Sequence, residues 1–275
     1  MQIQMEQDRG SVHAWNGACP GCAAEGTRAQ KFRRCPSCGT HWEPERRHYE
    51  YDDHYPESRA HGDEAIAACK VTTLADWCLH LNTSLAGRRV LEIGFGGGAT
   101  LAWMQAQGAR VHGVEPVEAN RTAARKSGIP ADRLAATIED AKGGPFDLTF
   151  HLDSFEHEIE PDAHLTALNR LTRPGTRALV VLPVADCLSR RLMGRFWPHD
   201  IADHWVFYST LGLTRLWDRH GWNLATTFHP RKYISGLTIA RHLQHKTGLP
   251  MPAAALRSTA VWLNFGERGL IFERR

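Results

Sequence analysis

Four cysteines stand in two pairs that have the spacing of metal ligands. Cys19 and Cys22 form the first C-x-x-C pair, and Cys35 and Cys38 form the second after 12 intervening residues. A C-x-x-C turn supplies two thiolates to one ion, and Zn²⁺ takes four such ligands in a tetrahedron. The spacing therefore predicts a zinc ribbon over residues 1–50. We expect a structural role for the zinc, because a four-thiolate site has no open position for catalysis.

A glycine-rich segment follows a short apolar run. The apolar run, residues 90–93, is predicted to be a strand, and the sequence Gly-Phe-Gly-Gly-Gly at 94–98 comes before a predicted helix. Glycines at such a turn let a ligand lie directly on backbone N–H groups. The segment also fits the dinucleotide-binding fingerprint, so the loop alone leaves the ligand open.

Two acidic residues favour one ligand. Glu92 lies two residues before Gly94, where a carboxylate would repel a pyrophosphate and attract an ammonium group. Glu115 ends the next predicted strand, 21 residues after Gly94, where an acid accepts both ribose hydroxyls. A ligand with a cation at one end and a free ribose at the other is S-adenosylmethionine (SAM). A nicotinamide dinucleotide is the alternative.

Histidines and acids follow the predicted fourth strand. A histidine can accept a hydroxyl proton near neutral pH, so His157 is the first candidate for a general base and His204 the second. His157 could instead only hydrogen-bond the loop that follows it. If the segment is helical, Asp153, Glu156 and His157 share one face, and His204 could complete a site for a hard cation.

Short apolar runs alternate with helical patterns from Arg88 onward, which predicts an α/β domain with a parallel sheet. The predicted strands are 90–93, 110–114, 134–137, 146–152, 177–182, 222–228 and 269–274. We divide the chain into a ribbon, a bridging segment with a helix, and a large domain, with bounds 1–50, 51–86 and 87–275. The large domain carries a substrate-covering insert at 184–209 and a second insert at 229–268, with a helix expected at 237–246.

Composition excludes several classes of protein. With 42% hydrophobic residues among 275, the chain can bury a core. Its 33 Lys and Arg against 30 Asp and Glu give a net charge of +3, well below that of a dedicated nucleic-acid binder. No apolar stretch approaches the roughly 20 residues of a membrane helix, and the N-terminus lacks the apolar part of a signal peptide. We therefore expect a cytoplasmic protein with a small-molecule substrate.

Several motifs together resemble the class I SAM-dependent methyltransferases, over about residues 86–228 and the last strand: LEIGFGGG, VHGVEP, FDLTFHLDSFEHEIEPDAHLTALNRLTRPGT and HWVFYSTLGLTRLWDRHGW. A four-cysteine ribbon ahead of the domain is similar to a subgroup of bacterial polysaccharide and natural-product pathways. The resemblance implies a doubly wound, Rossmann-like sheet of seven strands whose last strand is antiparallel. It also implies a set of cofactor contacts: Glu92, Gly94, Phe95, Gly96, Glu115, Pro116, Glu139, Leu152 and Asp153.

The resemblance implies methyl transfer to a small metabolite, a sugar or a natural-product intermediate, with O-methylation favoured. Two alternatives stay open: an RNA methyltransferase that docks through the ribbon, and a SAM-binding partner without catalysis. The acids and histidines after the fourth strand also resemble the Glu-x-x-Glu-His metal arrangement of small-RNA and ubiquinone-pathway O-methyltransferases. In this chain Asp153 stands where that arrangement has its first Glu.

Overall fold

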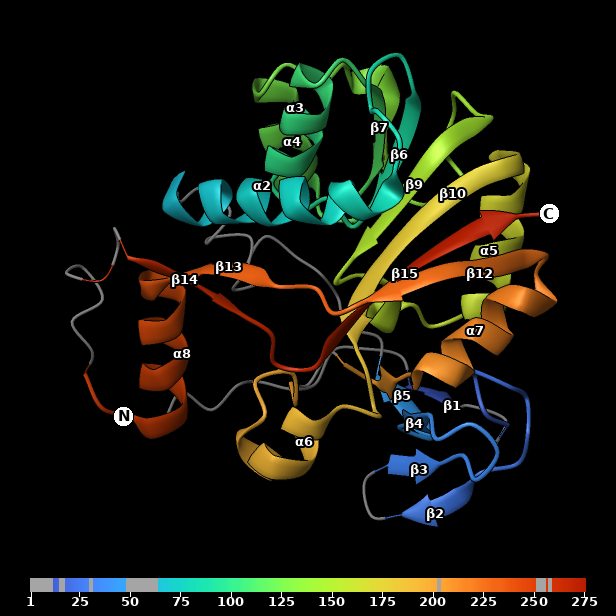
Figure 1. Ribbon diagram of the computed structural model, residues 1–275, viewed down its shortest axis with the longest axis vertical. Helices are drawn as coiled ribbons and strands as arrows, with labels where there is room; N and C mark the ends of the chain where they lie inside the picture. The colour runs from blue at the N-terminus through green and yellow to red at the C-terminus, as the bar shows by residue number, and fades with distance from the viewer. Residues whose placement is uncertain are drawn as a thin grey trace.

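A seven-stranded sheet forms the centre of the protein (Figure 1). The structure is a computed structural model, and it describes residues 12–14, 18–29, 32–47, 64–201, 204–250, 256 and 259–275. Predictions for the start of the ribbon and for residues 51–63 of the bridging segment lie outside the described residues.

The central sheet has the strand order β12-β15-β10-β9-β6-β7-β8. Its strands are β6 (Arg89–Ile93), β7 (Arg110–Val114), β8 (Leu134–Ala135), β9 (Phe146–Leu152), β10 (Thr172–Pro183), β12 (Trp222–Phe228) and β15 (Glu267–Arg274). The strands from β6 to β10 run parallel, whereas β15 is antiparallel to both β10 and β12. The prediction of a doubly wound α/β sheet with one antiparallel last strand is confirmed.

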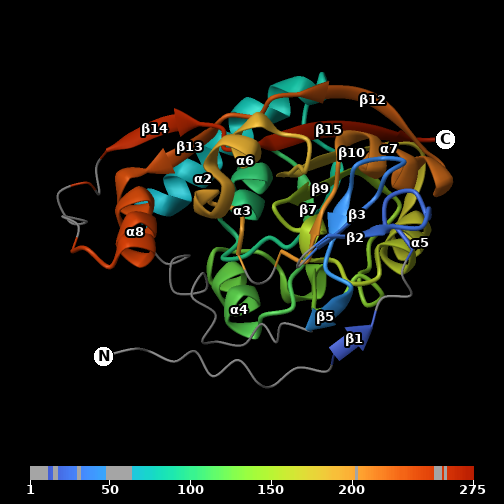
Figure 2. The ribbon, with the colours of Figure 1, turned by 90° about the horizontal axis from the view of Figure 1, so that it is seen from below.

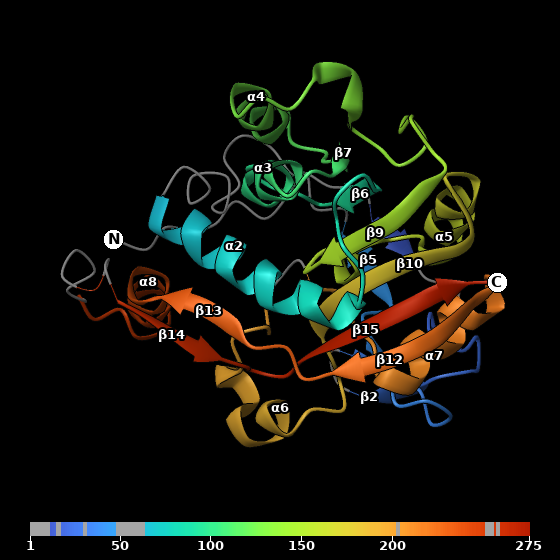
Figure 3. The same ribbon diagram turned by 45° about the horizontal axis from the view of Figure 1, so that its top comes forward.

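Two apolar clusters cover the two faces of this sheet. One face carries α2 (Glu64–Cys78), α3 (Ala99–Ala106) and α4 (Glu118–Lys126), and the other carries α5 (Pro161–Arg170) and α7 (Thr210–Arg219). Figure 3 shows α2 lying beside α3. Residues 178–182 of β10 are all buried, as expected for a strand covered on both faces. β10 also begins five residues earlier than predicted, because a register shift after Thr172 takes the Pro-Gly turn into the strand.

A second sheet joins the N-terminal ribbon to the large domain. Its order is β11-β4-β3-β2, where β2 (Thr27–Ala29), β3 (Phe32–Arg34) and β4 (His41–Trp42) belong to the ribbon. The fourth strand, β11 (Val206–Phe207), comes from the insert at 184–209, which also holds the short helices α6 (Leu188–Met193) and η4 (Gly194–Phe196). Two further ribbon strands, β1 (Val12–Ala14) and β5 (Glu45–Arg47), pair with each other. Figure 2 shows the molecule from below, with the ribbon strands β2 and β3 in front of the central sheet.

The insert at 229–268 forms a hairpin that carries a helix. Strands β13 (Lys232–Ser235) and β14 (Ala260–Leu263) pair antiparallel, with α8 (Gly236–Thr247) following β13. The sequence predicted the helix and missed both strands. The hairpin is tied to α2, since Trp77 Nε1 donates to the carbonyl of Arg231 at 3.0 Å. Among the described residues, no helix combines the length and the apolar character needed to cross a membrane.

Candidate active site and metal centre

The glycine loop between β6 and α3 has the backbone that only glycine adopts easily. Gly94, Gly96 and Gly98 have φ values of 75°, 56° and 82°, in the left-handed region. A Cβ atom on Gly94 would lie 2.6 Å from the Cβ of Ser154, so the loop also approaches the end of β9 closely. The loop therefore lies at the carboxyl edge of the sheet, where open α/β sheets bind their ligands.

Glu115 holds this loop in place. One carboxylate oxygen accepts the N–H of Gly96 at 2.9 Å, and the other accepts the N–H of Val117 at 3.0 Å. The side chain is buried. A carboxylate has about four lone-pair positions, so two backbone donors leave acceptor capacity for the two hydroxyls of a ribose.

Glu92 is a buried acid beside the loop. Only 2% of Glu92 is exposed, and Thr100 donates its hydroxyl to the carboxylate at 2.8 Å. Burial raises the pKa of Glu92 to about 7, against the opposing effects of the Thr100 hydrogen bond and the nearby Lys70 ammonium. A buried carboxylate of this kind gains most from a cationic partner.

A cleft lies between α2 and the glycine loop, and its lining residue Thr100 is the one that hydrogen-bonds Glu92. Helix α2 contributes Ile66, Ala67 and Lys70, and the loop and the start of α3 contribute the other lining residues: Phe95, Gly97, Ala99 and Thr100. Lys70 and Thr100 were not identified from the sequence. A carboxylate and an ammonium thus stand near one cleft, which is the charge pattern that complements the zwitterionic end of an amino acid.

The other predicted cofactor residues follow the ends of neighbouring parallel strands. Pro116 follows β7 and Glu139 follows β8, and both are exposed at this edge. Phe95 is buried instead, because its ring packs against the position of Gly113. Leu152 ends β9, and Asp153 comes next with a φ of 50°.

The histidine cluster lies after β9. Ligand atoms of Glu156, His157 and His204 all lie within 4.8 Å of one another. The rings of His157 and His204 are 4.7 Å apart, and His204 Nε2 is 3.8 Å from a Glu156 oxygen. Both Glu156 and His204 are buried. The structure thus brings Glu156 and His157 of the 3₁₀ helix η3 (Phe155–His157) together with His204 of the insert.

The expected place of Asp153 in that cluster is wrong. Asp153 has a left-handed backbone and is not among the clustered ligand atoms; its carboxylate pairs with Lys232 Nζ at 2.7 Å. Lys232 also contacts Glu267 at 3.1 Å, and the two acids raise the pKa of the lysine although burial alone would lower it. His199 contacts the same Glu267 oxygen at 3.1 Å. The network was not predicted, because its members, Asp153, His199, Lys232 and Glu267, come from four distant segments.

His204 has a defined tautomer at neutral pH. Its Nδ1 donates to the carbonyl of His199 at 2.9 Å, so the neutral ring presents Nε2 as an acceptor. Burial holds the pKa of His204 well below its usual range, and the neighbouring His157 and His199 act in the same direction. A neutral imidazole with a free lone pair can orient a hydroxyl or bind a metal ion.

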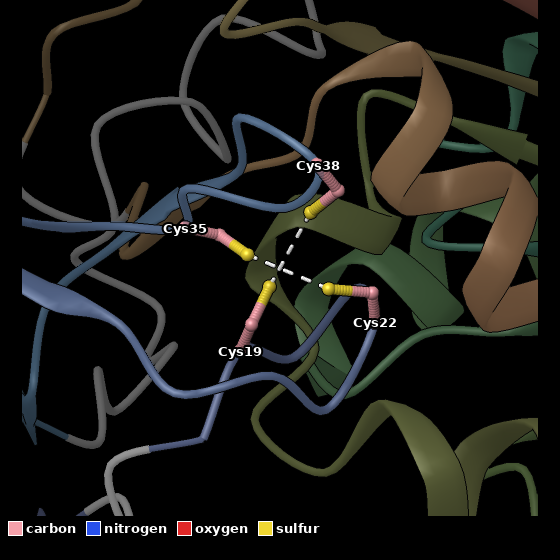
Figure 4. Close-up of side chains that lie close together, drawn as sticks. All are labelled: Cys19, Cys22, Cys35 and Cys38. Carbon is pink, nitrogen blue, oxygen red and sulfur yellow. Dashed lines mark hydrogen bonds between the residues drawn. The ribbon is translucent and has the colours of Figure 1, made fainter.

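The four paired cysteines converge on one point, as Figure 4 shows. Sulfur atoms are 3.6 Å apart in the pair Cys19 and Cys38, and 3.4 Å apart in the pair Cys22 and Cys35. A tetrahedral ion with sulfur ligands at 2.3 Å would separate them by about 3.8 Å, so the arrangement fits Zn²⁺ after small shifts. All four are free thiols, three of them buried.

A family model described as a methyltransferase domain matches residues 65–227. The chain belongs to this methyltransferase family. The resemblance predicted from the motifs is thus confirmed at the level of the family.

Curated relatives and solved structures agree with this methyltransferase assignment. A ubiquinone biosynthesis O-methyltransferase of Vibrio atlanticus is 34% identical over 107 residues, which cover 36% of this chain and 45% of the relative. A ubiquinone biosynthesis O-methyltransferase of Agrobacterium fabrum is 37% identical over 97 residues, which cover 33% of this chain and 39% of the relative. The chain therefore spans less than half the length of the curated relatives it matches.

The solved structures support the methyltransferase fold. A complex of the Haloferax volcanii Trm112 methyltransferase activator and a putative methyltransferase matches with a TM-score of 0.56 and 14% identity, covering 79% of this chain and 95% of that chain. Magnesium protoporphyrin IX methyltransferase of Synechocystis, solved with bound SAH, matches with a TM-score of 0.50 and 15% identity. The match covers 77% of this chain and 86% of that chain.

Proposed function

We propose that the protein is a SAM-dependent methyltransferase that methylates a small molecule, with a hydroxyl oxygen as the favoured acceptor. The observation that carries the proposal is Glu92, a buried carboxylate beside a glycine loop with a cation close by. Glu92 would bind the ammonium of SAM, Lys70 would face its carboxylate, and Glu115 would accept its ribose hydroxyls. A pyrophosphate would meet Glu92 as a like charge, which disfavours a nicotinamide dinucleotide.

The histidine cluster would serve the acceptor. As the hydroxyl oxygen bonds to the methyl carbon, the bond from that carbon to sulfur breaks and the hydroxyl proton must leave. His157 would accept this proton. His204, whose Nε2 is also an acceptor, is the second candidate for this role, and its lowered pKa makes it a weaker base than an exposed imidazole. Holding the two reactants in line supplies much of the rate in such a displacement.

A divalent cation is a second candidate for this cluster. Glu156, His157 and His204 lie within 4.8 Å of one another and offer one carboxylate and two imidazoles, a ligand set that suits a first-row cation. Such an ion would polarise the acceptor hydroxyl. Asp153 would not take part, since it is paired with Lys232.

We also propose a structural Zn²⁺ on Cys19, Cys22, Cys35 and Cys38, supported by the distances between the sulfur atoms. Four thiolate ligands are typical of a reducing compartment, which agrees with the expected cytoplasmic location. An RNA methyltransferase docking through the ribbon stays the alternative, disfavoured by a net charge of +3.

Native mass spectrometry followed by calorimetry tests the proposal. We expect one zinc per chain and binding of SAM and its demethylated product, with no binding of NAD. Label from methyl-tritiated SAM should then pass to a panel of phenols, 3,4-dihydroxybenzoate and simple sugars. His157→Ala should keep SAM affinity and lower turnover by about 10²-fold or more. Binding of NAD without SAM would overturn the assignment.

Three further arms separate the alternatives. Turnover that survives EDTA and does not respond to Mg²⁺ or Mn²⁺ would exclude the divalent cation at Glu156, His157 and His204. Binding of RNA with a steep salt dependence, together with methylation of RNA, would favour the ribbon-docking alternative. SAM binding without transfer to any acceptor class would favour the non-catalytic partner.

A further inference from the structure

The chain segment that follows His204 is held by the zinc ribbon. The carbonyl of Trp205 accepts the N–H of Glu43 at 2.8 Å. The next two residues, Val206 and Phe207, form β11 and pair antiparallel with β4. Residues 205–208 are all buried. The ribbon sheet therefore continues into the chain directly beside the candidate site.

The end of this segment contacts the second cysteine knuckle. Ser209 donates its hydroxyl to the carbonyl of Cys38, and its N–H donates to the hydroxyl of Thr40 at 3.3 Å. The Thr40 hydroxyl oxygen in turn lies 3.3 Å from the Cys38 sulfur, within hydrogen-bond distance. Cys38, a proposed zinc ligand, is thus connected to Ser209 both through its own carbonyl and through Thr40.

The ring of His204 packs against this segment. It contacts the ring of Phe207 edge to face at 5.9 Å, and Phe207 packs against Phe32 of the ribbon at 5.5 Å. The Arg190 guanidinium lies 4.5 Å from the Phe207 ring and 5.8 Å from the Phe32 ring. The carbonyl of Tyr208 accepts the N–H of Ala185 at 2.8 Å, so residues 205–208 are also held by the large domain, just after β10.

We infer that the zinc ribbon is a positioning element of the active site, which holds residues 205–209 and through Phe207 places His204 against Glu156 and His157. The inference rests on the proposed function for its catalytic meaning. Loosening the ribbon should displace His204 and leave the glycine loop unaffected, because Glu92 and Glu115 belong to the sheet edge between β6 and β7. A ribbon that only stabilised the chain would not act on His204 selectively.

Phe32→Ala tests this inference in the full chain. The change removes the ribbon side of the contact with Phe207 and leaves the four cysteines in place. We expect amide exchange at 205–209 to be about tenfold faster, and carbethoxylation of His204 by diethyl pyrocarbonate to be several-fold faster. Zinc content, measured by native mass spectrometry, and SAM affinity should stay within twofold. Chelation of the zinc should give the same two changes.

Thr27→Ala is the matched control. Thr27 lies on β2, the ribbon strand farthest from β11, and its hydroxyl hydrogen-bonds within the ribbon. This variant should exchange and react like the wild type. If Phe32→Ala loses its zinc or fails to fold, Phe32→Leu replaces it, with smaller changes in the same direction. Unchanged exchange at 205–209 and unchanged His204 reactivity in a folded, zinc-bound variant would overturn the inference.

Turnover then separates positioning from stability. With an acceptor from the panel above, Phe32→Ala should lower kcat about tenfold and add little further loss in the His204→Ala background. Losses that multiply in the double variant would show that the ribbon does not act through His204. Wild-type protein that binds no SAM would refute the proposed function, whereas the exchange and carbethoxylation results would still report on the ribbon.

Discussion

Glu92 carries a carboxylate whose charge is suppressed by burial before any ligand is bound. Burial raises its pKa to about 7, so the unliganded protein is stabilised by a proton on Glu92 at low pH. That contribution is lost as the pH rises from the unfolded value near 4.5 through 7. An ammonium from the cofactor would favour the ionised form. Binding of SAM should therefore be coupled to loss of a proton.

The affinity for SAM should accordingly rise with pH over this range. Between pH 6 and pH 7 the ionised fraction of a group with pKa 7 grows about fivefold, so Kd should fall by about the same factor. Calorimetry in buffers of different ionisation enthalpy would detect the released proton. In Glu92→Gln the pH dependence should disappear and binding should weaken. A flat Kd in the wild type would contradict the proposed pairing of Glu92 with the ammonium.

Helix α7 meets the ribbon at a close approach between two glycines. A Cβ atom on Gly212 would lie 2.1 Å from the Thr40 hydroxyl and 3.1 Å from the Cys38 sulfur. A Cβ atom on Gly21 would lie 3.0 Å from the Gly212 Cα. Arg219, the last residue of this helix, donates to the carbonyls of Pro20 and Gly21 and pairs with Asp162. The helix thus supports both cysteine knuckles.

Gly212→Ala should destabilise the protein although alanine favours helices. The gain in helix propensity is about 1 kcal/mol, whereas overpacking against the buried Thr40 hydroxyl and the Cys38 sulfur typically costs about 1–3 kcal/mol or more. We expect a lower free energy of unfolding and faster zinc loss to a chelator. Leu211→Ala is the control, because Leu211 is 47% exposed on the same helix and should change stability by less than about 0.5 kcal/mol. A stabilised Gly212→Ala would refute the argument from close packing.

The whole molecule is held together by a core that the ribbon shares. Cys35 and Trp42 of the ribbon belong to the same buried cluster as Phe207 and Trp217 of the large domain. The sheet that contains β4 also contains β11. Because the two parts bury one apolar cluster, neither can lose its packing without exposing the other.

Removal of the zinc should therefore lower the unfolding temperature of the entire chain. We expect a single transition by scanning calorimetry before and after chelation, displaced downward by about 5–15 °C. The four-cysteine variant with Ser at each position should behave like the chelated protein. An early transition for the ribbon, followed by a second at the original temperature, would show that the two parts unfold independently.

Local patterns in the sequence determined the elements and much of the site. A strand followed by glycines, an acid at the end of the next strand and paired C-x-x-C turns are each defined within a few residues. The order of βα units then places the ends of parallel strands at one edge. For this reason Glu92, Gly94 and Glu115 could be assigned to this edge from the sequence, and His157 to the segment that follows the next parallel strand.

Only the tertiary structure decided which distant segments complete the site. Strand β11 has two residues and no periodicity, so its pairing with the ribbon has no local signature. Lys70 is one polar position on α2, and it matters only because that helix crosses the glycine loop. Lys232, which lies 79 residues after Asp153 in the chain, similarly pairs with Asp153, so that Asp153 is not part of the histidine cluster. Such contacts depend on the packing of whole elements in three dimensions, which local propensity and spacing do not encode.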